Sequence, residues 1–581
     1  EDNTIGSYSN IIGVMPDYSG PDWYVSNSGS DAGDGSSSAP FATFQTAINK
    51  ASDGDTINIA PGTYTGDGNY NLSFDSKALT VVGTGGSNSV EIDIGGDYYN
   101  QRRFALIDYY GSDCDIDVSH DVEPNGATQG TQLGQSFTAE TTGYLSKVKF
   151  HSYNGSQAAS SYLKIREWNS DTYAYAFYGA ELATSGTPVD YPSNNESWQG
   201  LSTYTFSSPA YVEAGQKYVI EIVDGMPYVA HSSGYEGGEA YETLNQGYDR
   251  DFPFVTTVCS SFDVANAGET VIKGLSIMNG YAPDGEGGAL KINNSGSVTI
   301  DDCVIGPNNV GTQGGAIHIS NSDATINNSR IRGNYVTSSS GDAAGGALYI
   351  QNDDNETDHT VNIQKTVIRN SSVSINHYNF TSLKGGAISI EGVQSSDLTV
   401  NISDCVLLDN EVSLSSSSSG TAKGGAIYAS EADVNIVHST IVNNSATFGT
   451  NGSDGQAGGV YAGQNLGLSI LNSILWGNEA SNSSNEMITV ESSAAATINH
   501  SALQESYSGT SNLTDDPAFV NADNNNFALS ISSPLLGAGA PSGQGTYSLE
   551  SLISSTDMLG SARPGSGGGN PDIGALESSL A

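Results

Sequence analysis

The chain has 581 residues, with 19 Lys and Arg against 64 Asp and Glu, so its formal net charge is −45. Its 70 glycines fall far short of the roughly one-third that collagen needs, and a 37% hydrophobic fraction argues against wholesale disorder. So negative a chain is a poor partner for nucleic acid or an anionic membrane surface, and no apolar run is long enough to span a bilayer.

The N-terminal part predicts a cap followed by the first turns of a repetitive fold. The chain starts at Glu1 rather than at a methionine, and we interpret it as a mature form whose signal peptide has been removed. Residues 1–22 are expected to be an extension, and residues 23–124 to hold the cap and first coils. Within Phe41–Ala51 the apolar residues have helical spacing, and Thr56–Ile59 alternates as a strand. Such a helix would cover the open end of a stacked fold.

Residues 125–258 have a different character, because glycine repeats are absent and aromatic residues are dense. A segment of this length with alternating strands predicts an inserted β-sandwich or jelly roll. Cys114 and Cys259 bracket it and could form a disulfide at its neck, an alternative that the sequence leaves open. Most of the aromatic side chains are expected to fill the core. The candidates for exposed sugar-stacking contacts are Trp168, Trp198 and Tyr235.

Residues 259–530 are dominated by internal repeats. A Gly-Gly-Ala-aliphatic motif begins at Gly287, Gly314, Gly345, Gly385 and Gly424, and a looser copy, Gly-Gly-Val-Tyr, begins at Gly458. Each copy is followed by a short alternating strand, an aliphatic residue and a polar position occupied by Asn308, Asn334, Ser371, Asn410, Asn444 and Asn478. Short strands at this period, without helical periodicity, predict a right-handed parallel β-helix in which the asparagines form a hydrogen-bonded ladder.

The same repeats make three further predictions. Cys303 and Cys405 occupy one motif position several repeats apart, so we expect two buried free thiols. The Ser- and Gly-rich stretches between the polar position and the next Gly pair reach 13 residues, and we expect long loops there that could border a groove. An outward column containing Val406, Leu408 and Val442 is apolar and needs a cover, which could be the insert, the long loops or another molecule. We favour a cover from the same chain.

The two ends of the chain resemble a known group. The N-terminal run from Trp23 to Gly66, and the ending that includes Arg563-Pro564 and Pro571–Glu577, are similar to the secreted bacterial right-handed β-helix proteins of the pectate-lyase-like superfamily. Residues 531–581 would then be a closing segment. The resemblance implies the fold but not an activity, because the group spans polysaccharide lyases, glycoside hydrolases and surface proteins.

Candidate site residues follow from stacking the repeats. The position four residues after each first glycine gives an outward column of Lys291, His318, Tyr349, Ser389, Tyr428 and Ala462. Lys291, His318 and Tyr349, with Arg330 and Arg332 nearby, could neutralise a uronate, abstract its proton and protonate the leaving oxygen. Arg369, Lys384 and Tyr428 are candidate substrate-binding residues. An ordinary polar face of the solenoid is the alternative.

Other chemistries find less support in the sequence. A glycoside hydrolase needs two nearby carboxylates, and Asp301, Asp302, Asp404 and Glu391 are available but form no recognisable motif. Acidic loops could bind Ca²⁺, although solvated acidic loops would look the same. The candidate calcium ligands are Asp31, Asp34, Asp353, Asp354 and Asp358.

Three functions remain open at this point. The preferred one is a secreted or cell-surface β-helix protein, an adhesin or structural surface protein, that binds an extracellular polysaccharide, with calcium as a candidate cofactor. The second is a polysaccharide lyase or glycoside hydrolase acting on an acidic glycan along the β-helix. The third is a self-assembling surface or filament protein that associates through the apolar column.

Overall fold

The computed structural model describes most of the chain outside the N-terminal extension. The described residues are 18–74, 77–97, 100–108, 114–120, 126–128, 133–151, 162–168, 180–185, 201–223, 229–231, 240–242, 254–259, 268–282, 285–338, 342–353, 357–375, 381–393, 397–414, 420–448, 455–481, 487–542, 545–565 and 569–578.

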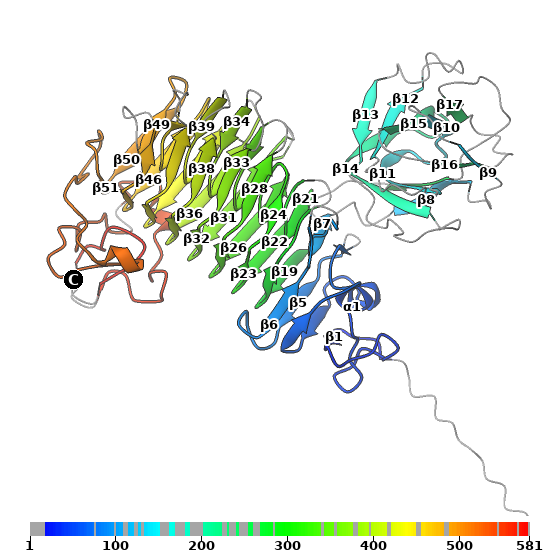
Figure 1. Cartoon of the computed structure of the whole chain (residues 1–581), viewed down its shortest axis with the longest axis horizontal. Coiled ribbons are helices and arrows are strands. Elements are labelled where there is room, and N and C mark those ends of the chain that lie inside the picture. The colour runs from blue at the N-terminus through cyan, green and yellow to red at the C-terminus, as the bar shows by residue number, and fades with distance from the viewer. Residues whose placement is uncertain are drawn as a thin grey trace, which may run out of the picture.

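Three long parallel sheets, stacked coil upon coil, confirm the predicted β-helix (Figure 1). Sheet A contains, in spatial order, β1 (Asp22–Val25), β2 (Thr56–Ile59), β5 (Thr80–Gly83), β19 (Glu269–Lys273), β22 (Ser297–Asp301), β26 (Asp323–Asn327), β31 (His359–Gln364), β36 (Leu398–Ser403), β41 (Asp433–Val437), β46 (Gly467–Leu471) and β50 (Ala495–Asn499). Sheet B contains β3 (Gly62–Tyr64), β6 (Val90–Asp93), β20 (Ser276–Met278), β23 (Val304–Ile305), β27 (Arg330–Arg332), β32 (Val367–Arg369), β37 (Val406–Leu408), β42 (Thr440–Val442), β47 (Ile474–Trp476) and β51 (Ala502–Leu503). Sheet C contains β4 (Leu72–Ser73), β7 (Ala105–Asp108), β21 (Leu290–Asn293), β25 (Ile317–Ser320), β30 (Leu348–Gln351), β35 (Ile388–Glu391), β40 (Ile427–Ser430), β45 (Val460–Ala462) and β49 (Ile488–Val490).

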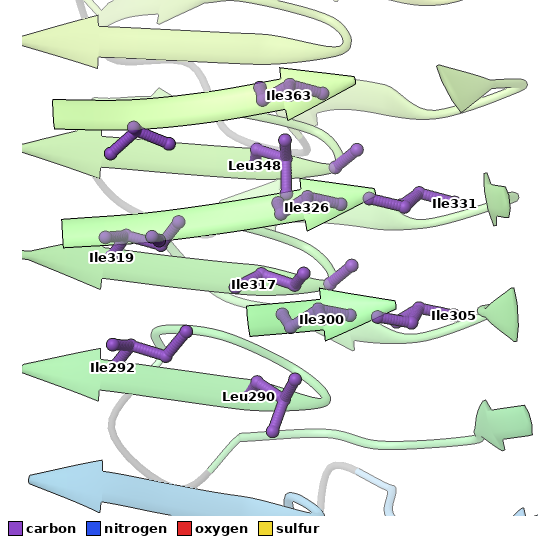
Figure 2. Packing of buried hydrophobic residues seen from close by; sticks show 14 of the residues in the cluster. Leu290, Ile292, Ile300, Ile305, Ile317, Ile319, Ile326, Ile331, Leu348 and Ile363 are labelled. Carbon is purple, nitrogen blue, oxygen red and sulfur yellow. The ribbon is translucent and has the colours of Figure 1, made fainter. Parts of the chain in front are cut away.

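The core is a stack of aliphatic side chains that point inward from all three sheets. In one coil, Leu290 and Ile292 of sheet C meet Ile300 of sheet A and Ile305 of sheet B, and the next coil repeats the arrangement (Figure 2). Each of these four side chains is fully buried. The predicted N-terminal helix is also present: α1 (Phe44–Lys50) buries Phe44, Ala47 and Ile48 in the same core. Because the aliphatic positions recur in every coil, burial of apolar surface stabilises the whole length of the stack.

Two polar ladders hold the corners between the sheets. Asn444 is fully buried, and its side-chain amide donates to Asn478 Oδ1 at 2.9 Å, while Asn410 donates to Asn444 Oδ1 at 2.9 Å. This confirms the predicted asparagine ladder. At another corner, backbone amides donate to the hydroxyl of the next coil, as from Cys405 to Ser439 at 3.2 Å. Cys303 and Cys405 occupy this second column as buried free thiols, as predicted.

The flanks of the segments expected to be long loops form two more parallel sheets, which corrects that part of the prediction, while the middles of most of these segments lie outside the described residues. Sheet D contains β24 (Asn309–Val310), β28 (Tyr335–Ser338), β33 (Ser372–Ile375), β38 (Glu411–Leu414), β43 (Ser445–Phe448) and β48 (Glu479–Ala480). The corner sheet contains β29 (Ala343–Ala344), β34 (Thr381–Lys384), β39 (Gly420–Lys423) and β44 (Gly455–Gln456). Val336 and Leu383 bury their side chains in a small hydrophobic cluster shared by the two sheets. This separate core explains why the described flanks of these segments form strands.

Between β7 and β19 the chain leaves the solenoid, since β19 pairs directly with β5 and β21 with β7. One antiparallel sheet contains β13 (Glu181–Thr184), β12 (Tyr162–Glu167), β15 (Lys217–Val223), β10 (Leu133–Thr138) and β17 (Ala240–Glu242). Another contains β14 (Leu201–Val212), β11 (Gly143–His151), β18 (Phe254–Cys259) and β8 (Cys114–His120), and β16 (Val229–His231) pairs with β9 (Gly126–Thr128). Residues of the two larger sheets share one hydrophobic cluster.

The sandwich or jelly-roll assignment of this segment, and its boundaries at residues 125 and 258, stay predictions. The backbone register places Cys114 opposite Cys259 on β8 and β18. Directly opposed residues of antiparallel strands have Cα separations of about 4.5–5.5 Å, which is a separation that a disulfide can bridge. The disulfide itself stays a prediction.

The C-terminal segment lies along sheet B and covers the apolar column. It contains β52 (Phe519–Asn521), η2 (Ala522–Asn524), β53 (Asn526–Leu529) and η3 (Glu550–Leu552). Its Phe527 and Ala575 pack on Leu408 and Val442, with Trp476 at the edge of the cluster. The prediction of a cover from the same chain is confirmed, but the covering segment is neither the insert nor the long loops. The self-assembly hypothesis therefore loses the surface on which it depended.

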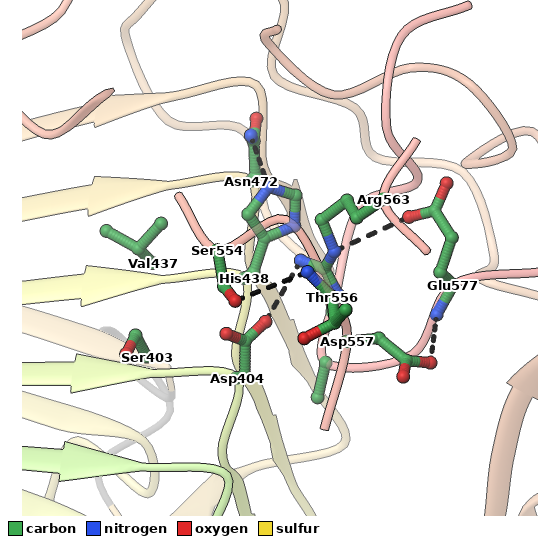
Figure 3. Close-up of polar contacts among 12 residues, drawn as sticks. Ser403, Asp404, Val437, His438, Asn472, Ser554, Thr556, Asp557, Arg563 and Glu577 are labelled. Atoms are coloured by element: carbon green, nitrogen blue, oxygen red, sulfur yellow. Dashed lines mark hydrogen bonds and ion pairs between the residues drawn. The ribbon is translucent and has the colours of Figure 1, made fainter. Parts of the chain in front are cut away.

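A buried ionic cluster fastens this segment to the solenoid. Arg563 Nη1 lies 3.2 Å from Asp404 Oδ1, and its Nε lies 3.5 Å from Glu577 Oε2 (Figure 3). Nη2 also donates to the carbonyl of Gly574 at 3.3 Å. The three charged side chains are at most 2% exposed. Asp404, at the corner after β36, is thus a docking residue and not part of a hydrolase pair.

Asp404 and His438, which both interact with Arg563, have pKa values shifted in opposite directions. Burial raises the pKa of Asp404 to about 6, against the opposing effect of Arg563. An unfolded aspartate has a pKa of about 3.9, so the contribution of Asp404 to stability is complete below that pH and is lost as the pH rises through about 6. Burial, reinforced by Arg563, holds the pKa of His438 well below its ordinary value. The contribution of His438 is therefore present above about pH 6.5 and is lost as the pH falls.

We expect the replacement Asp404→Asn to isolate the first of these two effects. Asparagine resembles the protonated acid, so the difference in unfolding free energy between variant and wild type should shift in favour of the variant, by up to about 3 kcal/mol, as the pH rises from about 4 to about 7. The His438 contribution is common to both proteins and cancels in the difference. Denaturant unfolding at several pH values measures it, and a difference that stays constant with pH contradicts the prediction.

Candidate functional site

The outward column of sheet C is in the register that the repeats predicted. Lys291 pairs with His318, His318 with Tyr349, Tyr349 with Ser389 and Ser389 with Tyr428. Successive residues therefore lie on adjacent coils, about 4.8 Å apart along the stack.

The prediction that Ala462 is the last member of the column was wrong. Tyr428 pairs with Tyr461, whereas Ala462 pairs with Ala429. The sixth motif, Gly-Gly-Val-Tyr, lacks the alanine of the other copies. The residue that continues the column is therefore the third after the first glycine in this motif, and not the fourth. With this correction the column carries three tyrosines, Tyr349, Tyr428 and Tyr461.

The first half of the column is a compact group of three coils. Lys291 Nζ lies 2.6 Å from Glu286 Oε2, and His318 Nε2 lies 3.9 Å from the same oxygen. The imidazole of His318 stacks on the ring of Tyr349, with centroids 5.2 Å apart. Burial, assisted by Glu391, raises the pKa of Tyr349. At neutral pH this phenol can therefore donate a proton but not abstract one.

Two lysines from the corner sheet cover the tyrosines of the second half. Lys384 Nζ lies 5.0 Å from the centre of the Tyr428 ring, and Lys423 Nζ lies 4.5 Å from that of Tyr461. The two rings stack on each other with centroids 5.5 Å apart. These are cation–π contacts, which hold the ammonium groups in fixed positions above the sheet.

Each of these lysines has a carboxylate partner. Lys384 donates to both oxygens of Glu391, at 3.1 and 3.0 Å, and Lys423 lies 3.7 Å from Glu491. The hydroxyl of Tyr461 donates to Glu491 at 2.5 Å. Burial disfavours the charge on Lys384, but Glu391 outweighs it, and the pKa of the lysine is raised. The lysine therefore stays charged at neutral pH.

We call these residues the sheet C strip. Its buried floor is the column Lys291, His318, Tyr349, Ser389, Tyr428 and Tyr461, and its flanking charges are Glu286, Lys384, Glu391, Lys423 and Glu491. The flanking side chains are 19–29% exposed, whereas Tyr428 is 8% exposed and His318 1%. Ammonium and carboxylate groups are therefore what the strip offers to a ligand. Its three lysines and three glutamates balance, so it is locally neutral on a chain of −45.

The structure does not bring the five candidate catalytic residues together. Lys291, His318 and Tyr349 lie on sheet C, but Arg330 and Arg332 lie on β27 of sheet B. Arg369 is the register partner of Arg332 on β32, so it also lies apart from Lys384 and Tyr428. One combined lyase site made from the five residues is thus excluded.

The carboxylates considered for a hydrolase are likewise scattered. Asp301 Oδ2 lies 2.7 Å from Lys273 Nζ on sheet A, and Asp302 accepts a hydrogen bond from Ser87 at 3.3 Å. Glu391 belongs to the sheet C strip. These side chains serve three different parts of the fold.

The candidate calcium ligands have structural partners. Asp31 accepts hydrogen bonds from the backbone amides of Ala42 and Thr43, and Asp34 accepts one from Ser36. Asp353 accepts one from Asn321 at 2.6 Å. Among the described residues, no group of three or more His, Cys, Asp or Glu side chains is arranged to hold a metal ion. Asp358 is exposed, Asp354 lies outside the described residues, and calcium binding stays a prediction.

Of the aromatic candidates in the insert, Trp168 is 38% exposed, and Lys217 Nζ lies 5.2 Å from its ring centre. Trp198 and Tyr235 lie outside the described residues. The role of Trp168 in ligand contact stays a prediction.

Sequence reasoning missed the flanking residues Glu286, Lys423 and Glu491, and Tyr461 on the floor. A signal for Lys423 was available, because Lys384 and Lys423 both precede a Gly-Gly-Ala motif and are register partners on β34 and β39. The same signal was available for Glu286, which also directly precedes a Gly-Gly-Ala motif, whereas Glu491 belongs to a coil without a Gly-Gly pair.

Comparisons with known proteins give one short family match and solved structures of low similarity. A family model described as "Protein of unknown function (DUF1565)" matches residues 27–71. A solved structure titled "Glycoside hydrolase" is 9% identical, with a TM-score of 0.27, and the match covers 88% of this chain and 99% of that one. Another, titled "The complex structure of XylC with xylose", is 12% identical, with a TM-score of 0.26 and coverages of 96% and 98%.

No curated protein matches the chain. Among the helices that the structure describes, none has the length and apolar character needed to cross a membrane. The parallel β-helix is therefore established by the strand pairing of the chain itself.

Proposed function

We propose that this chain is a secreted or cell-surface β-helix protein that binds an extracellular polysaccharide along the sheet C strip. The observation that supports this is the pair of lysines held over stacked tyrosines, each with a glutamate beside it, on consecutive coils. Ammonium and carboxylate groups form strong hydrogen bonds with hydroxyl groups, which a sugar chain presents at regular intervals. A rigid ladder repeats that chemistry without an ordering cost. The biological role would be that of an adhesin or a structural surface protein.

The lysines test the proposal. We expect the double replacement Lys384→Ala with Lys423→Ala to weaken binding to the recognised polysaccharide at least about tenfold, because each lost charged hydrogen bond is worth about 1.5–3 kcal/mol. Affinity electrophoresis against a panel of neutral and acidic polysaccharides identifies the ligand and measures the change. A matched control replaces Lys50 and Lys273 by alanine, because both are exposed, lie away from the strip and alter the charge equally. Equal weakening in both double variants, or no retardation of the wild type by any polysaccharide, would refute the proposal.

A second candidate function, a polysaccharide lyase, is favoured by the register of Lys291, His318 and Tyr349 on adjacent strands. Tyr349 would serve as the proton donor to the leaving oxygen. Incubation with alginate, pectate and sulfated glycans, followed by ultraviolet absorbance of the unsaturated product, tests it. Product formation that disappears in Tyr349→Phe supports the lyase, and the absence of product on all three substrates rejects it.

A further inference from the structure

Sheet B carries a group of arginines that neither function uses. Arg330 and Arg332 point outward from β27 on either side of the buried Ile331, and both are exposed. Arg332 is the register partner of Arg369 on the next coil. Alternate residues of one strand lie about 6.6 Å apart and register partners about 4.8 Å apart, so three positive charges share a small area.

These arginines have no counterions at contact distance in the part of the chain that the structure describes. Ion pairs are present at Lys273, Lys291, Lys384, Lys423 and Arg563, but none involves Arg330, Arg332 or Arg369. Burial raises the pKa of Asp409, and the positive charge of Arg369 opposes that shift without forming an ion pair with it. The three arginines thus lie close together without a carboxylate contact, although the chain has 64 acidic residues. Like charges at this spacing repel, and a bound anion would relieve the repulsion.

The neighbour of Arg332 on the preceding coil has no side chain. On the preceding coil, Gly306 follows the Ile305–Ile331 register pair and carries no side chain. A Cβ atom at Gly306 would lie 2.0 Å from the carbonyl oxygen of Arg332, so the close packing of the two coils requires a glycine there. Arg332 therefore has no register neighbour with a side chain on the preceding coil, while Arg369 is its register partner on the next coil.

An aromatic ring stands at the same corner. Tyr335 begins β28 after the turn that follows Arg332, and it is 44% exposed. Its hydroxyl lies 3.9 Å from the position that a Cβ atom of Gly333 would take. Its register partners Asn309 and Ser372 are polar, so no apolar cluster accounts for the ring. An exposed ring three residues after Arg332, together with the guanidinium groups of β27 and β32, suits a flat, partly apolar ligand that carries a negative group.

We propose that Arg330, Arg332, Arg369 and Tyr335 form a second site, which binds the sulfate or carboxylate group of an acidic sugar in a polysaccharide. Guanidinium groups bind such planar or tetrahedral oxyanions through paired N–H donors, and the tyrosine ring contacts the sugar face. The site lies on sheet B and does not depend on the sheet C strip. Salt screens the overall negative charge over about 8 Å at physiological ionic strength, so the local arginines decide the attraction.

The test uses the full chain with three polymers: a sulfated galactan, alginate as a polyuronate and a neutral β-glucan. We expect the wild type to bind the sulfated galactan, alginate or both, and Arg332→Ser with Arg369→Ser to weaken that binding at least tenfold in affinity electrophoresis. Loss on the galactan alone assigns a sulfate ligand, and loss on alginate alone a carboxylate. Tyr335→Ala should weaken the same binding. The matched control, Lys50→Ser with Lys273→Ser, changes the net charge equally and should alter binding by less than twofold.

Several outcomes would overturn the second site. These are absence of binding to both acidic polymers, equal loss in the arginine and lysine variants, and equal loss on the neutral glucan. Thermal melting separates binding from structure: removal of mutual repulsion should leave the arginine variant at least as stable as wild type, and a clearly lower melting temperature would mean a structural role instead. The polysaccharide site on sheet C stands or falls separately, on the Lys384 and Lys423 variants.

Discussion

Replacement of Arg563 by methionine is expected to detach the C-terminal segment from the solenoid. The guanidinium is buried with Asp404 and Glu577, so its removal leaves two buried carboxylates without their cation. Breaking a buried ion pair from one side costs about 3–5 kcal/mol. Release of the segment would also expose Leu408 and Val442, whose burial stabilises the docked state. Limited proteolysis should then cleave the segment in the variant under conditions in which wild type resists.

Lys365 provides the matched control for this experiment. Its Nζ donates to Thr556 Oγ1 at 2.6 Å, so it also links the solenoid to the C-terminal segment, but through a neutral partner that is only partly buried. Loss of one such charged hydrogen bond at a partly exposed site is worth about 1.5 kcal/mol, less than the loss of the buried ion pair, so Lys365→Met should leave the segment docked. Equal protease resistance of Arg563→Met and wild type would show that the apolar contacts alone hold the segment.

The second large effect is expected at the Gly-Gly corners. A Cβ atom at Gly386 would lie 2.2 Å from the carbonyl oxygen of Gly425 on the next coil and 2.7 Å from the backbone of Glu411. Both obstacles are backbone atoms, which cannot rotate away, so Gly386→Ala must separate adjacent coils. We expect a loss of about 3 kcal/mol or more, measured by thermal or denaturant unfolding.

Gly311 is the control for that substitution. No atom lies within 4 Å of the position that its Cβ would take, and its backbone is not left-handed. Alanine there should be neutral or should stabilise the fold by about 0.4–1 kcal/mol, because it restricts the unfolded chain. Similar stabilities of the two alanine variants would mean that the coils can adjust their spacing at the corners.

The repeats were sufficient to predict the solenoid, because each motif position has a fixed place in a coil. Asn444 in the ladder, Ile300 in the core and Cys405 at its corner all follow from that correspondence. Sheet D could also have been predicted. Val310, Val336 and Val373 each stand two residues after the ladder position, and this regular apolar residue inside an otherwise polar segment is typical of a strand with one buried face.

The features that the repeats did not predict depend on contacts outside the repeating pattern. Ala462 was placed in the column instead of Tyr461 because one residue is absent from that motif, and counting from the glycine cannot detect a local deletion. The contact between Arg563 and Asp404 joins a non-repetitive segment to a coil far away in the sequence. Arg330 and Arg332 were grouped with the sheet C residues because outward positions were known, whereas the face to which each belongs was not.

Docking of the C-terminal segment changes how the stack can come apart. A repeat array held only by contacts between neighbouring coils unfolds progressively from its end, one unit at a time. Here the segment bonds to Asp404, to Thr440 at 3.1 Å and to Asn472 at 2.7 Å, residues that belong to three successive coils. We therefore expect these coils to open together, after the segment has left, so that detachment of the segment limits the unfolding of this end of the solenoid.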